Sequence, residues 1–197
     1  MNPRVDKKFW EDFELVAGCD EAGRGPLAGP VVAAAVILPK FFFHPEIDDS
    51  KKLTPQKREK LFYLIQRSAV SFAFGIVPPE IIDEINILQA TKLAMREAIN
   101  GLRPQPEVVL IDALELEGLE IAQYSIIRGD RLSISIAAAS ILAKVKRDMI
   151  MLEYHRQYPW YGFDKNKGYP TSYHRQCLRK YGPSPIHRKS FRLSDAK

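Results

Sequence analysis

The sequence predicts an α/β fold of five strands and several helices, and three patterns support that class. A β-branched and alanine-rich run at residues 31–38 has the composition of a buried strand. The run at residues 107–111, in which four consecutive apolar residues follow Glu107, is typical of a parallel strand that is buried on both faces. Between these runs, Leu61, Leu64 and Ile65 keep the i, i+3, i+4 spacing of an amphipathic helix.

The first strand is predicted from the short apolar run that begins at Val16 and ends in two adjacent acids, Asp20 and Glu21. Residues 1–13 precede this strand as an extension, and we expect its aromatic side chains to dock on the core. A loop at residues 23–30, which contains three glycines and two prolines, joins the first strand to the second. The glycines leave backbone amides exposed there, so a sugar or phosphate can approach closely.

The middle of the chain predicts a helix, a strand and a second helix. Thr54 is the expected N-cap of a helix at residues 55–68, whose first residue is a proline. The third strand is predicted at residues 70–77, where two prolines end it. A helical pattern covers residues 81–99, and we expect it to divide into two pieces around Asn86.

The last part of the chain predicts a fifth strand and two more helices. The strand lies at residues 122–127, and a long helix follows at about residues 132–154. Three consecutive alanines at residues 137–139 permit this helix to pack closely on a sheet. A final helix begins after residues 168–171 and ends near residues 181–183.

Composition favours one soluble α/β domain. The chain has 197 residues, no signal-peptide pattern at its N-terminus and no apolar stretch of membrane-spanning length. Two cysteines are too few for a disulfide framework, so we expect a cytoplasmic protein. Residues 140–197 hold 13 basic and 4 acidic side chains, whereas residues 1–139 hold 16 and 20. This division predicts that the basic C-terminal third binds a polyanion and guides it to a site among the acids of the first part. A solvated basic surface without a ligand is an equally good interpretation.

Four carboxylates stand at predicted strand ends. They are Asp20 and Glu21 after the first strand, Asp112 after the fourth and Asp130 after the fifth. Ligands of open α/β sheets gather beyond the carboxyl ends of strands, so these side chains can converge. Oxygen ligands without His or Cys partners favour Mg²⁺ or Mn²⁺ over zinc. Four acids can hold two such ions, which is an arrangement that cleaves phosphodiesters.

Each of these acids also has a structural interpretation. Asp130 precedes a long helix, where Asp is a favoured N-cap. Asp112 can end its strand in a turn. Asp20 and Glu21 are consecutive strand residues, so both serve one site only if the pleat ends at Glu21.

Candidate substrate contacts lie on the long helix and after it. Ser140, Lys144 and Arg147 share one helix face, which can line a phosphate track or simply face solvent. Tyr169 can stack on a sugar or a base, or be partly buried. The four histidines lack metal-ligand spacing and are expected on the surface or in packing. Cys19 is expected to be a small buried filler.

Together these residues resemble the bacterial ribonuclease HII family. The resemblance runs from about Leu15 to Phe191. It is carried by residues 18–30, 49–53, 136–145 with Arg147 and Asp148, 168–171 and 182–188. It implies a ribonuclease H-like fold, with a mixed five-stranded sheet flanked by helices and a C-terminal helical extension. Residues 1–197 would form a single catalytic domain, with a core at about 15–155 and a substrate-contacting segment at 156–197.

The resemblance also implies an activity. The protein would hydrolyse the RNA strand of RNA–DNA hybrids and incise 5′ of single ribonucleotides in duplex DNA, as in ribonucleotide excision repair. Two Mg²⁺ or Mn²⁺ ions would serve the reaction, whose products carry 3′-hydroxyl and 5′-phosphate ends. Its partners would be RNA–DNA hybrids and ribonucleotide-containing duplexes, with no membrane, and we expect a monomer.

The family's functional positions transfer onto this chain residue by residue. The catalytic and metal-binding acids would be Asp20, Glu21, Asp112 and Asp130. The substrate-binding residues would be Gly23, Arg24, Gly25, Lys51, Lys52, Ser140, Lys144 and Tyr169. Two other classes stay open on the residues alone. Another metal-dependent nuclease on the same fold would not need a 2′-hydroxyl, and a non-catalytic binding module would need only the basic third of the chain.

Overall fold

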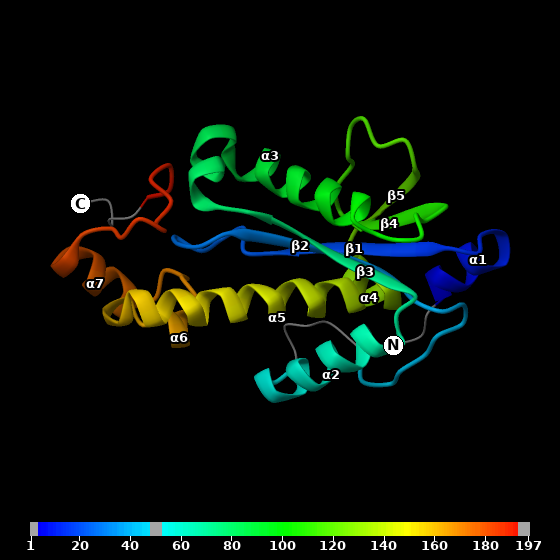
Figure 1. The fold of residues 1–197 in the computed structure, drawn as a ribbon, viewed down its shortest axis with the longest axis horizontal. Coiled ribbons are helices and arrows are strands. Elements are labelled where there is room, and N and C mark those ends of the chain that lie inside the picture. Colours follow the sequence, from blue (N-terminus) through cyan, green and yellow to red (C-terminus); the bar gives the residue numbers. More distant parts are fainter. Residues whose placement is uncertain (1–3, 48–52, 193–197) are drawn as a thin grey trace.

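A computed structural model describes residues 4–47 and 53–192 of the chain. Five strands form one sheet with helices on both of its faces (Figure 1). The strands are β1 Val16–Ala22, β2 Val31–Ile37, β3 Ser71–Val77, β4 Val108–Asp112 and β5 Ala122–Ile126. Their spatial order is β3-β2-β1-β4-β5. Because β1 is antiparallel to β2 and parallel to β4, the sheet is mixed, which confirms the predicted fold class.

The helices follow the predicted order. They are α1 Arg4–Asp12, α2 Pro55–Ser68, α3 Pro79–Asn100, α4 Gly129–Leu132, α5 Ile134–Gln157, α6 Phe163–Asn166 and α7 Ser172–Tyr181, with a 3₁₀ turn η1 at Pro159–Tyr161. The Thr54 side chain accepts a hydrogen bond from the Lys57 N–H and caps α2, as predicted. Asn86 has a φ of 66°, so α3 consists of two helical pieces, also as predicted.

The long helix differs from the prediction at its N-terminus. Helix α5 begins at Ile134, and the Ser133 hydroxyl caps it by accepting from the Ile136 N–H. Asp130 lies inside the separate short helix α4. Ser133 adopts an extended conformation, with φ −123° and ψ 126°, and this interrupts the helical path between α4 and α5. The interpretation of Asp130 as the N-cap of the long helix is therefore wrong.

Alternate residues of the central strands face opposite sides of the sheet. Val108 and Leu110 of β4 pack in the core beneath α5, and Val109 and Ile111 pack in the core beneath α3. Each such buried side chain stabilises the fold by roughly 1.5–3 kcal/mol relative to exposure. Helices α3 and α5 lie on opposite faces in Figure 1, so the predicted two-sided burial of this strand is confirmed.

Small residues bring α5 close to β1. A methyl group on Gly18 of β1 would lie 2.1 Å from the backbone carbon of Ser135, so only glycine fits at this contact. The alanines at residues 137–139 are fully buried and continue the close approach. Asp20 lies two residues beyond Gly18, on the same side of the strand, and therefore faces α5.

The N-terminal helix docks on the core, as predicted, and also holds α5. Trp10 of α1 is buried among core residues. The Asp6 carboxylate accepts hydrogen bonds from the Ser133 hydroxyl at 2.9 Å and from the N–H groups of Ile134 at 2.9 Å and Ser135 at 3.1 Å. An acid at a helix N-terminus satisfies its free amides and complements its dipole. Nothing local in the sequence identified Asp6 for this role.

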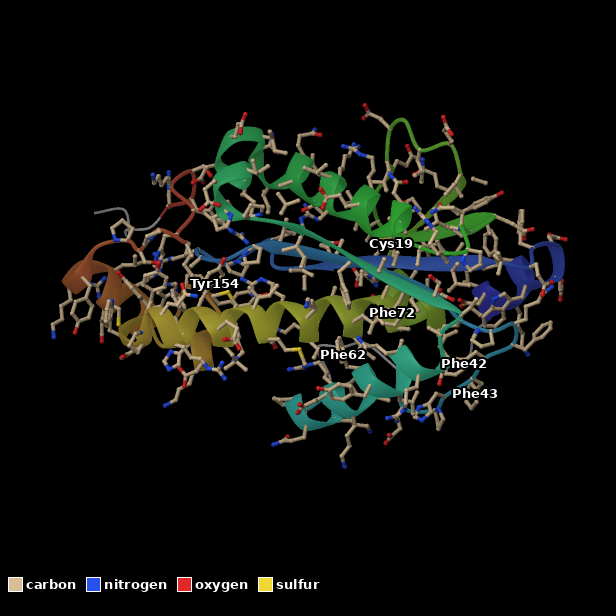
Figure 2. The ribbon with its side chains drawn as sticks, viewed as in Figure 1. Cys19, Phe42, Phe43, Phe62, Phe72 and Tyr154 are labelled. Carbon is tan, nitrogen blue, oxygen red and sulfur yellow. The ribbon has the colours of Figure 1, made fainter. Side chains whose placement is uncertain are left out.

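The C-terminal elements gather at one end of α5 (Figure 1). Phe163 of α6 and Leu178 of α7 share an apolar cluster with Leu27 and Met151, so the 23–30 loop is packed against the end of the chain. Figure 2 labels Cys19 on the sheet, where it is buried in the core toward α3, as predicted. Within the described residues, no helix has the length and hydrophobicity to cross a lipid bilayer.

Candidate active site

A cavity of about 230 Å³ opens where β1 and β4 end. These two strands are parallel, so their carboxyl ends meet at the same edge of the sheet. Three of the four predicted acids, Asp20, Glu21 and Asp112, line this cavity. The sequence therefore predicted correctly that acids far apart in the chain converge here.

Asp20 and Glu21 share the cavity for a reason that the sequence analysis did not foresee. Strand β1 pairs with β2 as far as Ala22, so the pleat does not end at Glu21, which was the condition stated for both acids to serve one site. Pairing with β4 stops at Cys19, however, and β1 then continues beyond its parallel neighbour. Past that point the consecutive residues Asp20 and Glu21 both line the cavity. The Glu21 N–H donates to Asp20 Oδ1 at 2.7 Å and fixes that carboxylate.

Burial perturbs the acids strongly. Asp20 is only 6% exposed, and its burial raises the pKa of its carboxyl well above 3.8, with further increases from the charges of Glu21 and Asp112. A hydrogen bond from Ser140 opposes this rise in the pKa of Asp20. Burial also raises the pKa of Glu21, while the Arg24 guanidinium 3.4 Å away works against it.

The donor set fits a hard divalent cation. Glu21 Oε2 is buried and accepts no hydrogen bond from the described residues. A cation among these carboxylates would supply that missing partner and offset their mutual repulsion. In the described chain, no three Cys, His, Asp or Glu side chains already stand close enough to enclose an ion. The carboxylates would therefore have to turn toward a bound cation.

Asp112 and Asp130 are linked through the backbone. The Gly129 N–H donates to Asp112 Oδ1 at 2.7 Å, which orients the carboxylate at the end of β4. Asp130 follows directly in α4 and is 6% exposed. It is not among the residues that line the cavity with the other three acids. Its role as a fourth metal ligand stays a prediction.

The same cavity collects most of the predicted substrate contacts. Besides the acids, its lining includes Gly23, Arg24, Gly25, Ser140, Lys144 and Tyr169. Lys144 Nζ lies 5.7 Å from the centroid of the Tyr169 ring and 2.7 Å from Asp148 Oδ1. Tyr169 is 40% exposed, so its ring is available to a ligand at the cavity. The predicted contacts Lys51 and Lys52 lie outside the described residues.

Arg147 does not belong to a phosphate track, so that interpretation is wrong for this residue. It is fully buried and donates to the carbonyl oxygens of Ala28 at 3.0 Å, Pro30 at 2.9 Å and Lys167 at 3.0 Å. The 23–30 loop and the C-terminal segment cover this turn of α5. Helical spacing placed Arg147 on one face with Lys144, but could not show what covers that face.

His174 and His187 are buried in packing, as predicted, and they are joined. Their Nε2 atoms lie 2.9 Å apart, and His187 Nδ1 accepts from the Ser184 N–H at 2.9 Å. His174 Nδ1 lies 2.9 Å from the Tyr169 carbonyl oxygen, to which it can only donate. Both rings are then neutral, with the proton between them on His187 Nε2. Burial, with a smaller contribution from the neighbouring His174 ring, lowers the pKa of His187 to about 4.

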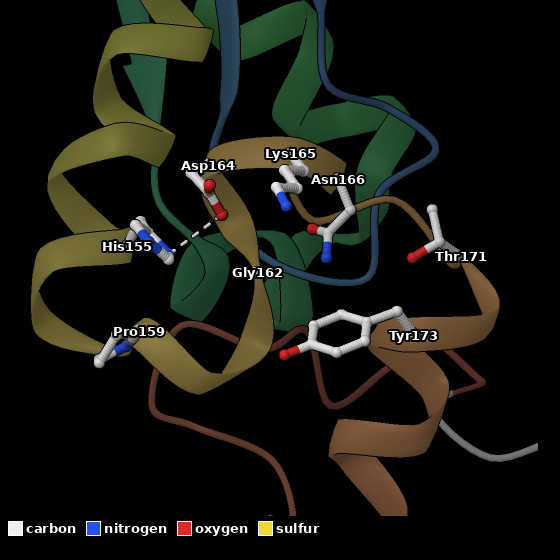
Figure 3. A pocket seen from close by; sticks show the side chains of 8 residues that line it. All are labelled: His155, Pro159, Gly162, Asp164, Lys165, Asn166, Thr171 and Tyr173. Carbon is white, nitrogen blue, oxygen red and sulfur yellow. Dashed lines mark ion pairs between the residues drawn. The ribbon is translucent and has the colours of Figure 1, made fainter.

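A larger cavity of about 520 Å³ lies between α5, α6 and α7. Figure 3 shows His155, Asp164, Lys165 and Tyr173 among the side chains around it. His155 Nδ1 lies 3.4 Å from Asp164 Oδ1. Of the described residues that line it, only Asp164 is acidic. Because it lacks clustered carboxylates, we locate the candidate active site in the smaller cavity.

Comparison with known proteins identifies the family of this chain. The family model named Ribonuclease HII matches residues 17–194. The chain belongs to the ribonuclease HII family. The ribonuclease HII of Desulfitobacterium hafniense is 59% identical over 189 residues, which are 95% of this chain and 73% of that protein. The ribonuclease HII of Syntrophus aciditrophicus is 53% identical over 193 residues, covering 98% of this chain and 91% of that protein.

A solved structure supports the same assignment. Ribonuclease H2 from Pyrococcus horikoshii aligns with a TM-score of 0.76 at 29% identity, over 91% of this chain and 95% of that one. Membership of the ribonuclease HII family makes this protein a metal-dependent nuclease, a hydrolase that acts on nucleic acid. The family cleaves the RNA strand of RNA–DNA hybrids. The ribonuclease H-like fold expected from the sequence is confirmed.

Proposed function

We propose that this protein also incises duplex DNA on the 5′ side of single embedded ribonucleotides, using two Mg²⁺ or Mn²⁺ ions. One observation carries the proposal. A single cavity combines three carboxylates with the backbone of residues 23–25 and the ring of Tyr169. The carboxylates suit hard cations, and the glycine-containing backbone suits close contact with a ribose. The 2′-hydroxyl is the group that distinguishes RNA from DNA.

The acids have distinct parts in the proposal. Asp20, Glu21 and Asp112 would hold the cations, with Asp130 of α4 as the fourth ligand. Bound divalent cations would lower the pKa of water and stabilise charge on the scissile phosphate. Water attacks the phosphorus and the bond to the 3′-oxygen breaks, which leaves 3′-hydroxyl and 5′-phosphate ends. Ser140 orients Asp20 through its hydrogen bond and is thereby a positioning residue.

The other side of the cavity would recognise the substrate. The backbone at Gly23 and Gly25 would contact the 2′-hydroxyl, and the Tyr169 ring would pack against the sugar at the junction. Arg24 and Lys144 supply positive charge for phosphates beside these groups. Lys51 and Lys52 are proposed contacts on the family's pattern alone.

The proposal extends to the organisation of the protein. We assign a catalytic core to about residues 15–155 and substrate contact to residues 156–197, within one catalytic domain that acts as a monomer. The basic charge of the C-terminal third supports this division. Both cysteines are free thiols, which is consistent with action in the cytoplasm, in ribonucleotide excision repair.

Mapping one cut tests the proposal. The purified protein is incubated with Mg²⁺ and a DNA duplex that contains a single ribonucleotide, beside an identical all-DNA duplex. We expect one incision 5′ of the ribonucleotide and no cut in the all-DNA duplex. Equal cutting of both duplexes would show a nuclease that does not read the 2′-hydroxyl.

The role of Tyr169 has a matched control. Tyr169→Ala should reduce cleavage most on the single embedded ribonucleotide and less on a continuous hybrid, because one junction contact matters most where only one ribose is present. Tyr173 is similarly exposed but lines the other cavity, so Tyr173→Ala should leave that ratio unchanged. An equal loss on both substrates for Tyr169→Ala would contradict junction recognition.

A further inference from the structure

Arg188 is a buried arginine that directs all of its donor groups at the 23–30 loop. Its side chain has no exposed surface. Nε donates to the Gly29 carbonyl at 2.9 Å, Nη1 to the Arg24 carbonyl at 3.1 Å and Nη2 to the Gly23 carbonyl at 2.6 Å. No ion pair joins it to a carboxylate of the described residues. Carbonyl dipoles therefore stabilise its charge, and its planar fork fixes their directions.

Fixing a carbonyl also fixes the amide of the next residue. In a planar trans peptide, the C=O and the following N–H point in opposite directions. The peptide bonds after Gly23 and Arg24 are trans. Because Arg188 holds the carbonyls of Gly23 and Arg24, the N–H groups of Arg24 and Gly25 point away from it. Both of these residues line the acid cavity.

These two amides differ from the others that buried arginines orient. Arg147 holds the Ala28 and Lys167 carbonyls, but the following N–H groups already have acceptors. The Gly29 N–H donates to the Ile186 carbonyl at 2.9 Å, and the Gly168 N–H donates to Asn166 Oδ1 at 2.8 Å.

The amides beside Arg188 have no such acceptor. Among the described residues, none accepts a hydrogen bond from the N–H of Arg24 or Gly25. Two oriented and unused donors at a cavity are suited to an oxygen-rich ligand.

We propose that Arg188 is a positioning residue that aims the N–H groups of Arg24 and Gly25 at the ribonucleotide, where they donate to the 2′-hydroxyl and the adjacent phosphate. This inference rests on the proposed recognition of a single ribose. Arg188 itself never touches the substrate. Its contribution is the direction of two backbone donors that a flexible glycine loop would otherwise leave free to rotate.

Binding measurements on an inactive parent test the inference. Asp20→Asn is used to stop cleavage, and Kd is measured for a duplex with one ribonucleotide and for the same all-DNA duplex. The parent is expected to prefer the ribonucleotide. Adding Arg188→Lys keeps the charge but removes the fork, and should reduce this preference roughly tenfold, the effect of one or two hydrogen bonds.

Arg147→Lys in the same parent is the matched control. It breaks equally buried hydrogen bonds to carbonyls, so the melting temperature should fall by a similar amount. The preference for the ribonucleotide should fall less than with Arg188→Lys, because the N–H groups that follow the Ala28 and Lys167 carbonyls are already bonded and the packing of Arg147 5.8 Å from the Tyr169 ring is the remaining contact that changes. A parent without any preference would refute the proposed function. A preference that persists undiminished with Arg188→Lys would overturn the role of Arg188 alone.

A second measurement does not depend on the folding of the Arg188 variant. In ¹⁵N-labelled Asp20→Asn protein, the amide resonances of Arg24 and Gly25 should shift on adding the ribonucleotide duplex and much less with all-DNA duplex. The Gly29 amide, which is bonded internally, is the control resonance and should respond equally to both. Equal responses of Arg24 and Gly25 to the two duplexes would overturn the inference even if Arg188→Lys does not fold.

Discussion

Two groups of charged side chains near the 23–30 loop differ in their hydrogen-bond partners. Arg147 and Arg188 are fully buried, and each donates three hydrogen bonds to backbone carbonyls. Asp20 is buried and Glu21 is partly buried at the end of β1, the strand that leads into the loop held by these arginines, and one Glu21 oxygen has no partner among the described residues. Burial shifts the pKa of all four side chains toward their neutral forms, so the difference lies in the hydrogen-bond partners. Every side-chain nitrogen of the two arginines has a hydrogen-bond partner, whereas a carboxylate oxygen of Glu21 has none among the described residues.

This difference distinguishes residues that stabilise the fold, such as Arg147 and Arg188, from residues of the candidate active site, such as Asp20 and Glu21. A buried charge whose hydrogen bonds are all satisfied rigidifies its surroundings. A buried charge that lacks a partner destabilises the fold and is retained where a ligand supplies the partner. The arginines hold the loop, and the acids are the proposed ligands of the cations. The predictions below test this contrast, beginning with the largest expected effect.

Neutralising one acid should abolish cleavage and leave the fold intact. Asp20→Asn should lower kcat by at least about 10³-fold, because an ion that stabilises the transition state by several kcal/mol loses a ligand. The same variant should melt at a higher temperature than the wild type without metal, since it removes repulsion. Glu153→Gln, which alters an exposed acid on α5, is the control for both assays. Near-normal turnover by Asp20→Asn would contradict the assignment.

Removing a buried arginine should lower the stability of the protein, whereas neutralising Asp20 should raise it. Arg147→Met leaves three buried carbonyls without donors and should destabilise the protein by about 3–5 kcal/mol. Chemical denaturation measures this loss. Arg156→Met removes a largely exposed arginine of the same helix and should change stability by less than about 0.5 kcal/mol. Similar values for the two variants would show that the carbonyl contacts contribute little.

The neutral histidine pair should limit stability in acid. The pKa of His187 is lowered to about 4 from 6.5, so the unfolded chain binds a proton that the folded protein excludes. Stability should therefore fall as pH drops from 6.5 to about 4, by at most about 3 kcal/mol for this group. Denaturation across this range should show the fall in the wild type and a smaller one in His187→Gln. If the unfolding free energy falls equally with pH in both proteins, other titratable groups cause the fall.

The acids predict a smaller pH effect of opposite sign. Above pH 3.8 the unfolded state releases the Asp20 proton before the folded state does, so stability from this group falls as pH rises. The stability gap between Asp20→Asn and wild type should widen from pH 3.8 toward neutrality. Mg²⁺ at saturating concentration should narrow the gap at neutral pH by about 1–3 kcal/mol. A gap that is independent of both pH and Mg²⁺ would contradict a buried Asp20 whose charge is destabilised by burial and by Glu21 and Asp112.

The sequence predicted those features that neighbouring residues determine. Thr54 and Pro55 define the start of α2, and Asn86 marks the break in α3, because both signals act within a few residues. The convergence of Asp20 and Asp112 was also predictable, since parallel strands place their carboxyl ends together.

The remaining features depend on what covers a residue in space. Asp130 and Ser133 are both good N-caps, and only the extended conformation of Ser133 decides between them. Arg147 shares a helix face with Lys144, but the loop that buries it comes from more than 100 residues earlier. Arg188 belongs to a segment that the family resemblance highlighted, yet nothing in its spacing shows that it is buried or which carbonyls it holds.

Asp6 is an example of a residue whose role depends on partners that are distant in the sequence. Its carboxylate meets partners 127 to 129 positions further along the chain, at the start of the helix that carries Ser140 and Lys144. During synthesis, these hydrogen bonds can form only after residues 133–135 have been made. Removal of residues 1–12 would take away the acceptor of these hydrogen bonds and should loosen the start of α5, the helix that carries the proposed substrate contacts Ser140 and Lys144.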